Sequence, residues 1–287
     1  MFGPKFMQSQ VKTYCIIGDP ISSSLSPSMQ NAAFNHLNLN CTYIAYKVSK
    51  DELEDSINSL RAINIAGFNV TIPNKVEIIK YMNDLDQTAK KANAVNTVIN
   101  VDGVFKGYNT DIYGFIEPLH RRKVNFDGMK ILLLGAGGAA HAIIAALSEE
   151  KGIFKIMISN RNQERANELK KMGSTLGLEC ETAELSNTSH IASTSNLIIN
   201  TIPQEMIDKE NIIGYQHISK DSIVYDINYK PVITDLIENA RYANADVVYG
   251  YEMLLEQGAK AFEIWTGINA PRDAMKKALF GIFGEPR

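Results

Sequence analysis

The chain has 287 residues, of which 45% are hydrophobic, and its formal net charge at pH 7 is −3. This length allows one large core or two domains, and the near-neutral charge gives no electrostatic footprint for nucleic acid or a membrane surface. No apolar run approaches the roughly 20 residues that a bilayer span needs, and the N-terminal MFGPKFMQSQ lacks the apolar core of an export signal.

About the first 110 residues alternate short apolar runs with amphipathic stretches, which is typical of an α/β unit. Ser26 followed by Pro27 indicates a helix start, because serine is a favoured N-cap and proline suits the first helical position. Strands are predicted at residues 13–18, 41–48, 65–72 and 95–100, and helices at residues 26–36, 51–62, 75–82 and 111–120.

The rest of the chain keeps alternating, at a spacing that predicts a mostly parallel, doubly wound sheet. The connection at residues 121–128 is polar, and we interpret its basic triplet, Arg121 to Lys123, as a solvated face. Strands are predicted at residues 131–134, 153–159, 178–182, 196–201, 222–227 and 246–248, with helices between them and two closing helices at residues 251–266 and 270–283.

The strongest functional pattern is a glycine-rich loop between a predicted strand and a predicted helix. An apolar run at residues 131–134 is followed by GAGGAA and then by a helix-favouring stretch. Gly135 permits the sharp turn, Gly137 lets the backbone approach a pyrophosphate, and Ala140 is small enough for the helix to pack on the strand. The helix N-terminus adds free N–H groups that attract phosphate. The pattern predicts a dinucleotide site; the alternative is an ordinary tight turn.

The end of the next strand indicates which dinucleotide is bound. An NAD site would carry Asp or Glu there, whereas this chain reads Ser159-Asn160-Arg161-Asn162. Arg161 and Arg165 are one helical turn apart and could both bind a 2′-phosphate. NADP is therefore favoured over NAD, and the alternative is a solvated helix start in which Glu164 pairs with an arginine.

The three cysteines, Cys15, Cys41 and Cys180, are odd in number, widely spaced and set among apolar residues. They are typical of small buried hydrophobes in a reducing compartment and form neither a disulfide framework nor a metal cluster. The five histidines show no ligand spacing either. We therefore expect a cytoplasmic protein that binds no metal.

Two polar clusters lie at the ends of predicted elements, where α/β proteins place ligand groups. The serines of Ser22–Ser26 could bind a carboxylated or polyhydroxylated ligand; alternatively, Ser26 caps a helix and the rest is loop. Asn69–Lys75 places Lys75 in the first turn of a predicted helix, where the helix dipole disfavours a cation. An acid could compensate, and Asp111, at another predicted helix start, is the candidate.

A third polar cluster is Asn93–Thr97, joined by Asn109–Asp111. At these residues the chain resembles the shikimate dehydrogenases, over nearly its full length and in the order of the family's motifs. The motifs are GDPISSSLSP, NVTIPNK, NAVNT, GYNTD, GAGGAA, NRNxxR, DINYKP and GYEMLLEQGAKAF. Departures are Asn74, where the family often has an aromatic residue, Asn162 in place of threonine, and Glu205 in place of a turn glycine.

The resemblance implies a role for particular residues. Lys75 and Asp111 would be catalytic, and Asp111 would also contact substrate. The other implied substrate-binding residues are Ser24, Ser26, Thr71, Asn96, Tyr229 and Gln257. The implied NADP-binding residues are Gly135, Ala136, Gly137, Gly138, Ala139, Asn160, Arg161, Arg165, Thr201, Ile227 and Gly250.

The resemblance also implies the architecture and the reaction. A substrate domain (residues 1–112 and 249–287) would face a Rossmann-type, doubly wound NADP domain (residues 113–248) across a cleft. The implied reaction is the reversible reduction of 3-dehydroshikimate by NADPH to shikimate, in the shikimate pathway of aromatic amino acid and chorismate biosynthesis. The partners are then small molecules, with a homodimer left open.

Three other functions remain as alternatives. A quinate/shikimate dehydrogenase would accept more substrates and cofactors, and the missing acid after the second strand counts against NAD use. A regulatory NADP sensor on the same scaffold would not need Lys75 and Asp111. A methylenetetrahydrofolate-type dehydrogenase would not need the serine-rich loop with Gln257.

Overall fold

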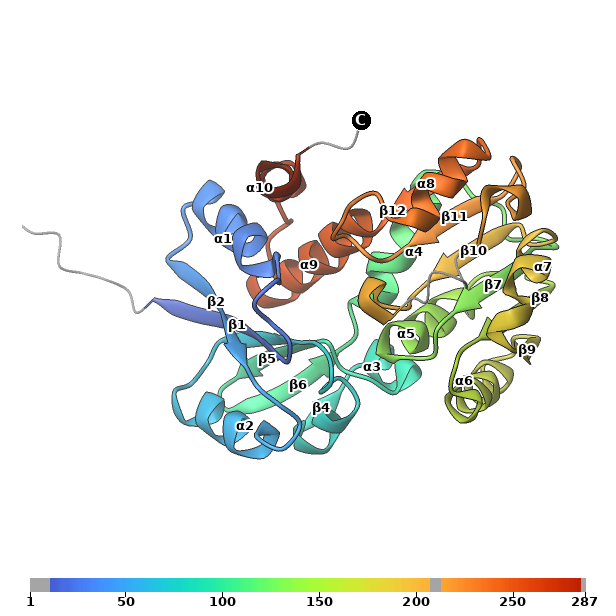
Figure 1. Ribbon diagram of the computed structural model, residues 1–287. Coiled ribbons are helices and arrows are strands. Elements are labelled where there is room, and N and C mark those ends of the chain that lie inside the picture. Colours follow the sequence, from blue (N-terminus) through green and yellow to red (C-terminus); the bar gives the residue numbers. More distant parts are fainter. Residues whose placement is uncertain (1–10, 207–212, 285–287) are drawn as a thin grey trace, which may run out of the picture. The chain divides into compact units, whose positions relative to one another are not determined.

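The computed structural model describes residues 11–206 and 213–284, and within these ranges the chain separates into two units (Figure 1). The first contains residues 11–90, 94–110 and 258–284, and the second contains residues 91–93, 111–206 and 213–257. The expected domain boundary is after residue 248, whereas the observed division lies later, between Gln257 and Gly258. The N-terminal segment in which we expect no export signal lies outside the described residues.

The first unit is built on a six-stranded mixed sheet of order β2-β1-β3-β5-β6-β4. β1 pairs in parallel with both β2 and β3, whereas β5 is antiparallel to β3 and β6. The strands are β1 (Lys12–Gly18), β2 (Cys41–Lys47), β3 (Gly67–Val70), β4 (Asp84–Leu85), β5 (Thr97–Val101) and β6 (Val104–Tyr108). The helices that begin in this unit are α1 (Ser26–His36), α2 (Leu53–Ala62), the 3-10 helix η1 (Glu77–Tyr81), α3 (Gln87–Ala92) and α10 (Arg272–Phe283).

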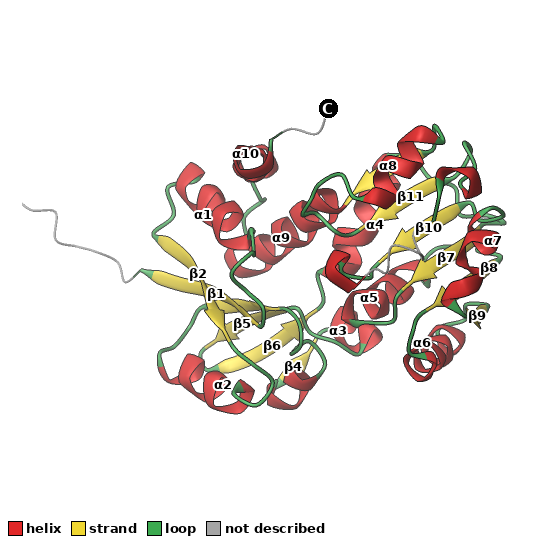
Figure 2. Cartoon of the chain, viewed as in Figure 1, coloured by secondary structure: helices red, strands yellow, loops and turns green. Residues whose placement is uncertain are grey.

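The two faces of this sheet are covered by different segments (Figure 2). One face packs against α2, whose Leu53, Ile57 and Leu60 lie at helical spacing and are buried with Phe68 of β3. The other face is covered by α1 and by the C-terminal segment, through ring contacts of Tyr14 and Phe34 with Trp265 and Phe262.

The C-terminal segment reaches the sheet because β3 starts with a glycine. A Cβ added to Gly67 would lie 2.6 Å from Nε1 of Trp265 and 2.8 Å from the carbonyl oxygen of Val98. The indole N–H of Trp265 donates a 2.9 Å hydrogen bond to that carbonyl. Residues 258–284 therefore belong to the first unit, and Phe262 and Trp265 are part of its hydrophobic core.

The second unit is a six-stranded, fully parallel sheet of order β12-β11-β10-β7-β8-β9. Numbered from β7, this is the order 3-2-1-4-5-6 of a dinucleotide-binding fold. The strands are β7 (Lys130–Leu134), β8 (Lys155–Ser159), β9 (Cys180–Ala183), β10 (Leu197–Asn200), β11 (Ile223–Asp226) and β12 (Asp246–Tyr249). The α-helices are α4 (Asp111–Arg121), α5 (Gly138–Leu147), α6 (Gln163–Thr175), α7 (Thr188–Ala192), α8 (Asp235–Tyr242) and α9 (Gly250–Thr266), which continues into the first unit; short 3-10 turns are η2 (Leu185–Asn187), η3 (Gln204–Met206) and η5 (Tyr215–His217).

Both faces of this sheet are buried, which confirms the doubly wound prediction. Ile131 and Leu133 of β7 join the core under α4, α5 and α6, whereas Leu132 and Leu134 join the core under α7 and α8. A strand buried on both faces needs an unbroken apolar run, because successive side chains point to opposite faces.

One predicted helix is wrong, and one interpretation is incomplete. Residues 75–82 do not form an α-helix: only the 3-10 helix η1 forms there, and it starts after Lys75. The basic triplet is exposed, as interpreted, and two of its residues also form ion pairs: Arg121 pairs with Glu256 at 2.8 Å, and Arg122 makes hydrogen bonds of 2.8 and 2.9 Å to Glu252. These pairs join the end of α4 to α9.

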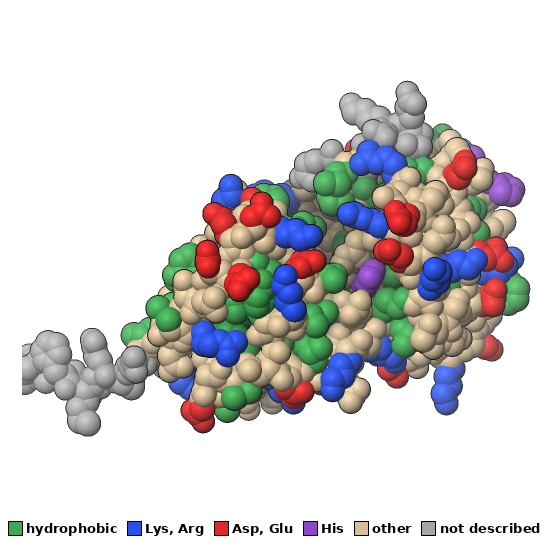
Figure 3. Space-filling model, turned by 90° about the horizontal axis from the view of Figure 1, so that it is seen from below, with side chains coloured by type: hydrophobic (Ala, Val, Ile, Leu, Met, Phe, Trp, Pro, Cys, Tyr) green, Lys and Arg blue, Asp and Glu red, His purple; other side chains and the backbone are tan. Residues whose placement is uncertain are grey.

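The surface mixes charges of both signs. On the face seen in Figure 3, Lys and Arg side chains alternate with Asp and Glu over the described part of the chain. In residues 11–206 and 213–284, no helix combines the length and the apolar character that crossing a membrane requires.

Candidate active site

In the first unit, three segments meet at one edge of the sheet. β1 and β3 end there, and β5, which is antiparallel to β3, begins there. The backbone N–H of Thr71 donates to the carbonyl of Ile17 at 2.9 Å, and that of Val70 donates to the carbonyl of Asn96 at 2.8 Å. This edge brings together the serine loop after β1, the segment carrying Thr71 and Lys75 after β3, and Asn96 before β5.

The serine loop starts α1 in a way that differs from the prediction. Leu25 is the N-cap and has no side-chain cap, so Ser26 is the first helical residue and not the N-cap. The hydroxyl of Ser24 accepts the N–H of Ser26 at 3.3 Å, and the N–H of Ser24 donates to the carbonyl of Ile21 at 3.0 Å. The hydroxyl of the buried Ser26 thus does not cap the helix.

A buried tyrosine, which the sequence reasoning missed, connects the serine loop to the sheet edge. Tyr43 of β2 is 1% exposed, and its hydroxyl donates to Oδ1 of Asn69 at 2.7 Å. Burial raises the pKa of Tyr43 well above its usual value, and a hydrogen bond with the Ser26 side chain opposes this shift. The phenol therefore stays protonated and bridges Ser26 and Asn69. The alternating strand pattern around Tyr43 was the available signal, since it places this side chain inside.

Asn69 extends this network to the start of β5. Its Nδ2 donates to Oγ1 of Thr97 at 2.9 Å and to the carbonyl of Asn96 at 3.0 Å. The Asn96 side chain in turn holds Thr110, accepting its N–H at 2.7 Å and donating to its hydroxyl at 3.0 Å. Asp111 is the next residue and the first of α4, as predicted. A chain of buried amides and hydroxyls thus fixes the backbone just before Asp111.

Lys75 lies in the turn between β3 and η1 and is half-buried. The turn is fixed on both sides: the carbonyl of Lys75 accepts the N–H of Val95 at 2.7 Å, and Nδ2 of Asn74 donates to the carbonyl of Val48 at 2.9 Å. Asn74, a departure from the family pattern, is fully buried and holds this turn. Because η1 starts at Glu77, Lys75 stands outside the first helical turn, and the expected dipole penalty does not apply.

In the second unit, the glycine loop follows β7 as predicted. Gly135 has a φ of +100°, and a Cβ there would lie 2.3 Å from Oγ1 of Thr201, whose hydroxyl donates to the carbonyl of Leu134 at 2.7 Å. A Cβ on Gly137 would meet nothing within 4 Å. Gly137 is the N-cap of α5 and has no side chain, so it forms no side-chain hydrogen bond to the first N–H groups of this helix. Gly138 and Ala139 form the first turn of α5, and Ala136 is buried.

The loop after β8 carries the two predicted arginines. Arg161 and Arg165 are both exposed, on either side of the start of α6. Asn162, the departure from the family's threonine, caps α6 by accepting the N–H of Arg165 at 3.0 Å. Asn160 donates to the carbonyl of Asn162 at 2.8 Å. The asparagine thus replaces threonine as a helix cap and leaves both guanidinium groups at the surface.

A buried acid, Asp226, is another residue that the sequence reasoning missed, and it orders the loops after β10 and β11. Asp226 is fully buried; it accepts hydrogen bonds from Thr234 at 2.7 Å, from the Asn228 side chain at 2.8 Å and from Asn200 at 3.1 Å. Burial raises the pKa of this carboxyl above its usual value, and the hydrogen bonds offset only part of that rise. The predicted Thr201 follows Asn200 in the chain, and the predicted Ile227 and Tyr229 follow Asp226. A charged residue at the end of a buried strand was the signal.

The remaining predicted residues lie on or beside α9. Gly250, the first residue of α9, allows a close approach, since a Cβ there would lie 2.3 Å from the carbonyl oxygen of Asn228 and 2.4 Å from that of Ile227. Gln257 packs against Gly114 of α4 and donates to the carbonyl of Leu254 at 2.9 Å. Tyr229 is half-buried. The described residues contain no group of three His, Cys, Asp or Glu side chains that could hold a metal ion.

The parallel sheet with its glycine loop, together with a second α/β unit whose hydroxyl, amide and lysine groups share one sheet edge, defines a dinucleotide-binding protein with a separate polar ligand site. Family models match both units: "Shikimate dehydrogenase substrate binding domain" at residues 16–98, "Shikimate / quinate 5-dehydrogenase" at residues 118–245, and "Shikimate 5'-dehydrogenase C-terminal domain" at residues 250–280.

Known proteins give the same result. The shikimate dehydrogenase (NADP(+)) of Nitrosopumilus maritimus is 46% identical over 272 residues, covering 95% of this chain and 99% of that protein. The Listeria monocytogenes shikimate 5-dehydrogenase in complex with shikimate and NAD is 34% identical with a TM-score of 0.85, covering 96% and 99% of the two chains. The Thermus thermophilus shikimate 5-dehydrogenase in complex with NADP(H) and shikimate is 29% identical with a TM-score of 0.81, covering 93% and 98%. The chain belongs to the shikimate dehydrogenase family.

Proposed function

We propose that this protein is an NADP-dependent oxidoreductase that catalyses the reversible reduction of 3-dehydroshikimate to shikimate, a step of aromatic amino acid and chorismate biosynthesis. The observation that carries this proposal is the 46% identity, over 95% of the chain, to a protein named shikimate dehydrogenase (NADP(+)). The fixed lysine turn and the serine loop support it, because this reaction needs a proton donor and a carboxylate site.

The residues of the second unit fit NADP. The open space in front of Gly137 and the uncapped start of α5 suit a pyrophosphate, and the exposed Arg161 and Arg165 suit a 2′-phosphate. In this proposal, Gly135 to Ala139 bind the pyrophosphate, Asn160 and the arginines bind the adenosine phosphate, and Thr201, Ile227 and Gly250 lie beside the nicotinamide half. When bound, the cofactor supplies the hydride.

The proposal gives each polar group of the substrate site one task. Ser24 and Ser26 bind the substrate carboxylate, and Thr71, Asn96, Tyr229 and Gln257 orient the ring hydroxyls. As the substrate carbonyl becomes an alkoxide, Lys75 donates a proton from Nζ to that oxygen, and it takes the proton back in the reverse reaction. Asp111 holds the lysine ammonium and a ring hydroxyl.

The test is the absorbance of reduced nicotinamide, with the purified protein given shikimate or quinate and NADP⁺ or NAD⁺ in all four combinations. The proposal predicts a strong signal only with shikimate and NADP⁺. A comparable signal with quinate or NAD⁺ would instead identify a broader quinate/shikimate enzyme. No signal in any combination, with NADP still bound, would contradict the catalytic roles and favour a sensor.

The proposal also includes the location and assembly of the enzyme. A cytoplasmic location is supported by the three cysteines, which are free thiols, as expected in a reducing compartment. The assembly is left open between a monomer and a homodimer, which sedimentation of the purified protein distinguishes.

The two loop glycines should respond differently to alanine. In Gly137→Ala, the new Cβ meets open space and φ is −96°, so the free energy of unfolding should change by less than about 1 kcal/mol. The methyl group would lie where a pyrophosphate approaches, so the Kd for NADP should rise at least about tenfold. Isothermal titration calorimetry gives the Kd, and urea unfolding gives the stability.

Gly135→Ala provides the contrast. Its positive φ and the contact with Thr201 should cost about 1–3 kcal/mol of stability from the backbone alone. Equal stability losses in the two variants, or unchanged NADP binding by Gly137→Ala, would contradict the proposed cofactor loop.

Replacing Tyr43 with phenylalanine should weaken substrate binding without affecting NADP. The variant loses the hydrogen bond to Asn69 and the partner of Ser26, leaving Asn69 Oδ1 buried and unsatisfied. We expect the KM for shikimate to rise about fivefold, the equivalent of one neutral hydrogen bond, with a smaller change in kcat. The matched control is Tyr46→Phe, since Tyr46 lies on the same strand but is 42% exposed. A change in the KM for NADP⁺ would indicate general destabilisation instead.

A further inference from the structure

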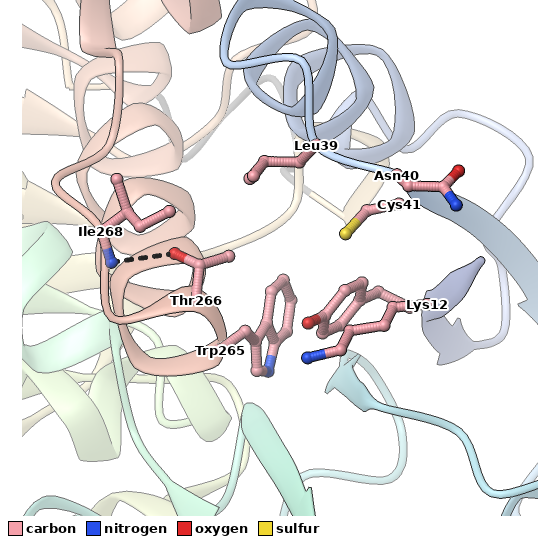
Figure 4. A pocket seen from close by; sticks show the side chains of 8 residues that line it. Lys12, Leu39, Asn40, Cys41, Trp265, Thr266 and Ile268 are labelled. Carbon is pink, nitrogen blue, oxygen red and sulfur yellow. Dashed lines mark hydrogen bonds between the residues drawn. The ribbon is translucent and has the colours of Figure 1, made fainter. Parts of the chain in front are cut away.

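The first unit contains a hollow at the opposite end of β1 from the serine loop. β1 runs from Lys12 to Gly18; the serine loop follows Gly18, whereas the hollow opens beside Lys12 (Figure 4). The segment leading into β2 and the end of α9 form its other walls. Its volume is about 260 Å³. None of the residues proposed to bind substrate or NADP lines it.

The walls combine aromatic rings, apolar side chains and one charge. The rings of Tyr14 and Trp265 form one wall, with centroids 5.0 Å apart, and Leu39 and Ile268 are the aliphatic members. Among the described residues that line the hollow, Lys12 is the only charged one. Its side chain is directed into the hollow, toward Trp265. Burial raises the pKa of Tyr14 to about 12, so its hydroxyl stays neutral and does not oppose an anion.

We propose that this hollow is a binding site for a small aromatic carboxylate. The ring would lie between Leu39, Ile268 and the exposed part of Trp265, which is 7% exposed, and the carboxylate would pair with the ammonium group of Lys12. The size supports this class, because the volume lies below the roughly 300–1,000 Å³ of sites for drug-sized ligands and suits a single ring with a short acidic group.

Occupancy of the hollow would reach the substrate-binding residues through one side chain. Trp265 contacts Tyr43, with ring centroids 5.9 Å apart, and Tyr43 bonds to Asn69 and to Ser26. Trp265 therefore has the hollow on one side and, through Tyr43, the proposed carboxylate-binding serine on the other. A ligand that shifts the indole changes the environment of Tyr43, and so couples to substrate affinity.

The chain carries its own probe for this site, because Trp265 is its only tryptophan. Benzoate, titrated into the full-length protein, should change the Trp265 fluorescence in a saturable manner, while the neutral benzyl alcohol binds at least about tenfold more weakly. Saturating shikimate is present, so that benzoate cannot occupy the substrate carboxylate site; this precaution depends on the proposed function. Lys12→Met should weaken benzoate binding about tenfold or more, and Lys277→Met, at an exposed position of α10, should not.

A second measurement does not depend on the enzyme's substrate. Cys41 lines the hollow and is partly exposed, whereas Cys15 and Cys180 are buried, so a maleimide should label Cys41 first. Benzoate should slow this labelling in the natural chain and not in Lys12→Met. A fluorescence change that is unsaturable or insensitive to Lys12→Met, or labelling that benzoate does not slow, would overturn the site.

The coupling is tested by reciprocity. If the hollow and the substrate site are linked, shikimate must change the Kd of benzoate by the same factor as benzoate changes the Kd of shikimate. The benzoate Kd is taken from the signal that Lys12→Met abolishes, because benzoate can enter the substrate carboxylate site below saturating shikimate. An unchanged Kd of this signal across a shikimate titration would overturn the coupling through Tyr43, although the binding site itself would stand.

Discussion

Lys75→Ala should lower kcat for shikimate oxidation by about 10²–10⁴-fold, the usual contribution of a general acid–base group. The KM for shikimate should change far less, because the proton moves only as the reaction proceeds. The turn that carries Lys75 is fixed by backbone and Asn74 hydrogen bonds, so removing the side chain leaves the loop in place. Steady-state kinetics with varied shikimate at saturating NADP⁺ measures both constants.

Lys80→Ala is the matched control for Lys75→Ala. Lys80 lies in η1, close to Lys75 in the chain, is exposed, and pairs with Glu77 at 3.3 Å. Exposed pairs of this kind contribute little to stability, so kcat and KM should stay near those of the natural chain. If Lys75→Ala lowered kcat and raised KM by equal factors, Lys75 would be a binding residue. If kcat were unchanged, the proton would come from another group.

The second large effect concerns the choice between NADP and NAD. The double variant Arg161→Ala, Arg165→Ala should raise the KM for NADP⁺ about 100-fold, because it removes two charge-assisted contacts to a 2′-phosphate. The KM for NAD⁺, which lacks that phosphate, should stay nearly constant. Comparing the two cofactors in one variant separates phosphate recognition from any damage to the loop.

Lys171→Ala, an exposed lysine farther along α6, serves as the control for the general positive charge of this helix. It should leave both KM values unchanged. The cap at Asn162 is kept in all variants, so α6 should start at the same residue. A parallel rise of the KM for NADP⁺ and NAD⁺ in the double variant would mean that the arginines act on the fold of the loop and not on the phosphate.

The strands of the parallel unit were predictable to within two residues at each end, because most of them are apolar runs followed by turn residues. The strand after Asp102-Gly103 was not. β6 reads VFKGY, and Gly107 interrupts its pattern; a Cβ at Gly107 would lie 2.8 Å from Val95 and 3.0 Å from Leu85, so packing explains the glycine. α3 has only six residues, too few for a helical period to show.

The candidate site also has parts that show in the sequence and parts that do not. Lys75, Asp111 and the loop glycines stand in short motifs and could be named from the sequence. The Tyr43–Asn69–Thr97 network could not, because its members come from β2, β3 and β5, and only the strand pairing brings them together. The apparent helix start at Lys75 was wrong for a related reason: the backbone of this turn is fixed by Val95 and Val48, which are distant in sequence.

The membership of residues 258–284 in the first unit sets an order for the synthesis of this protein. The strands of the first unit leave the ribosome early, but Tyr14, Phe34 and Gly67 have no cover until Phe262 and Trp265 have been translated. All six strands of the second unit are complete by Tyr249, and domains fold as their residues emerge. The half of the protein that is translated first is thus the half that is finished last.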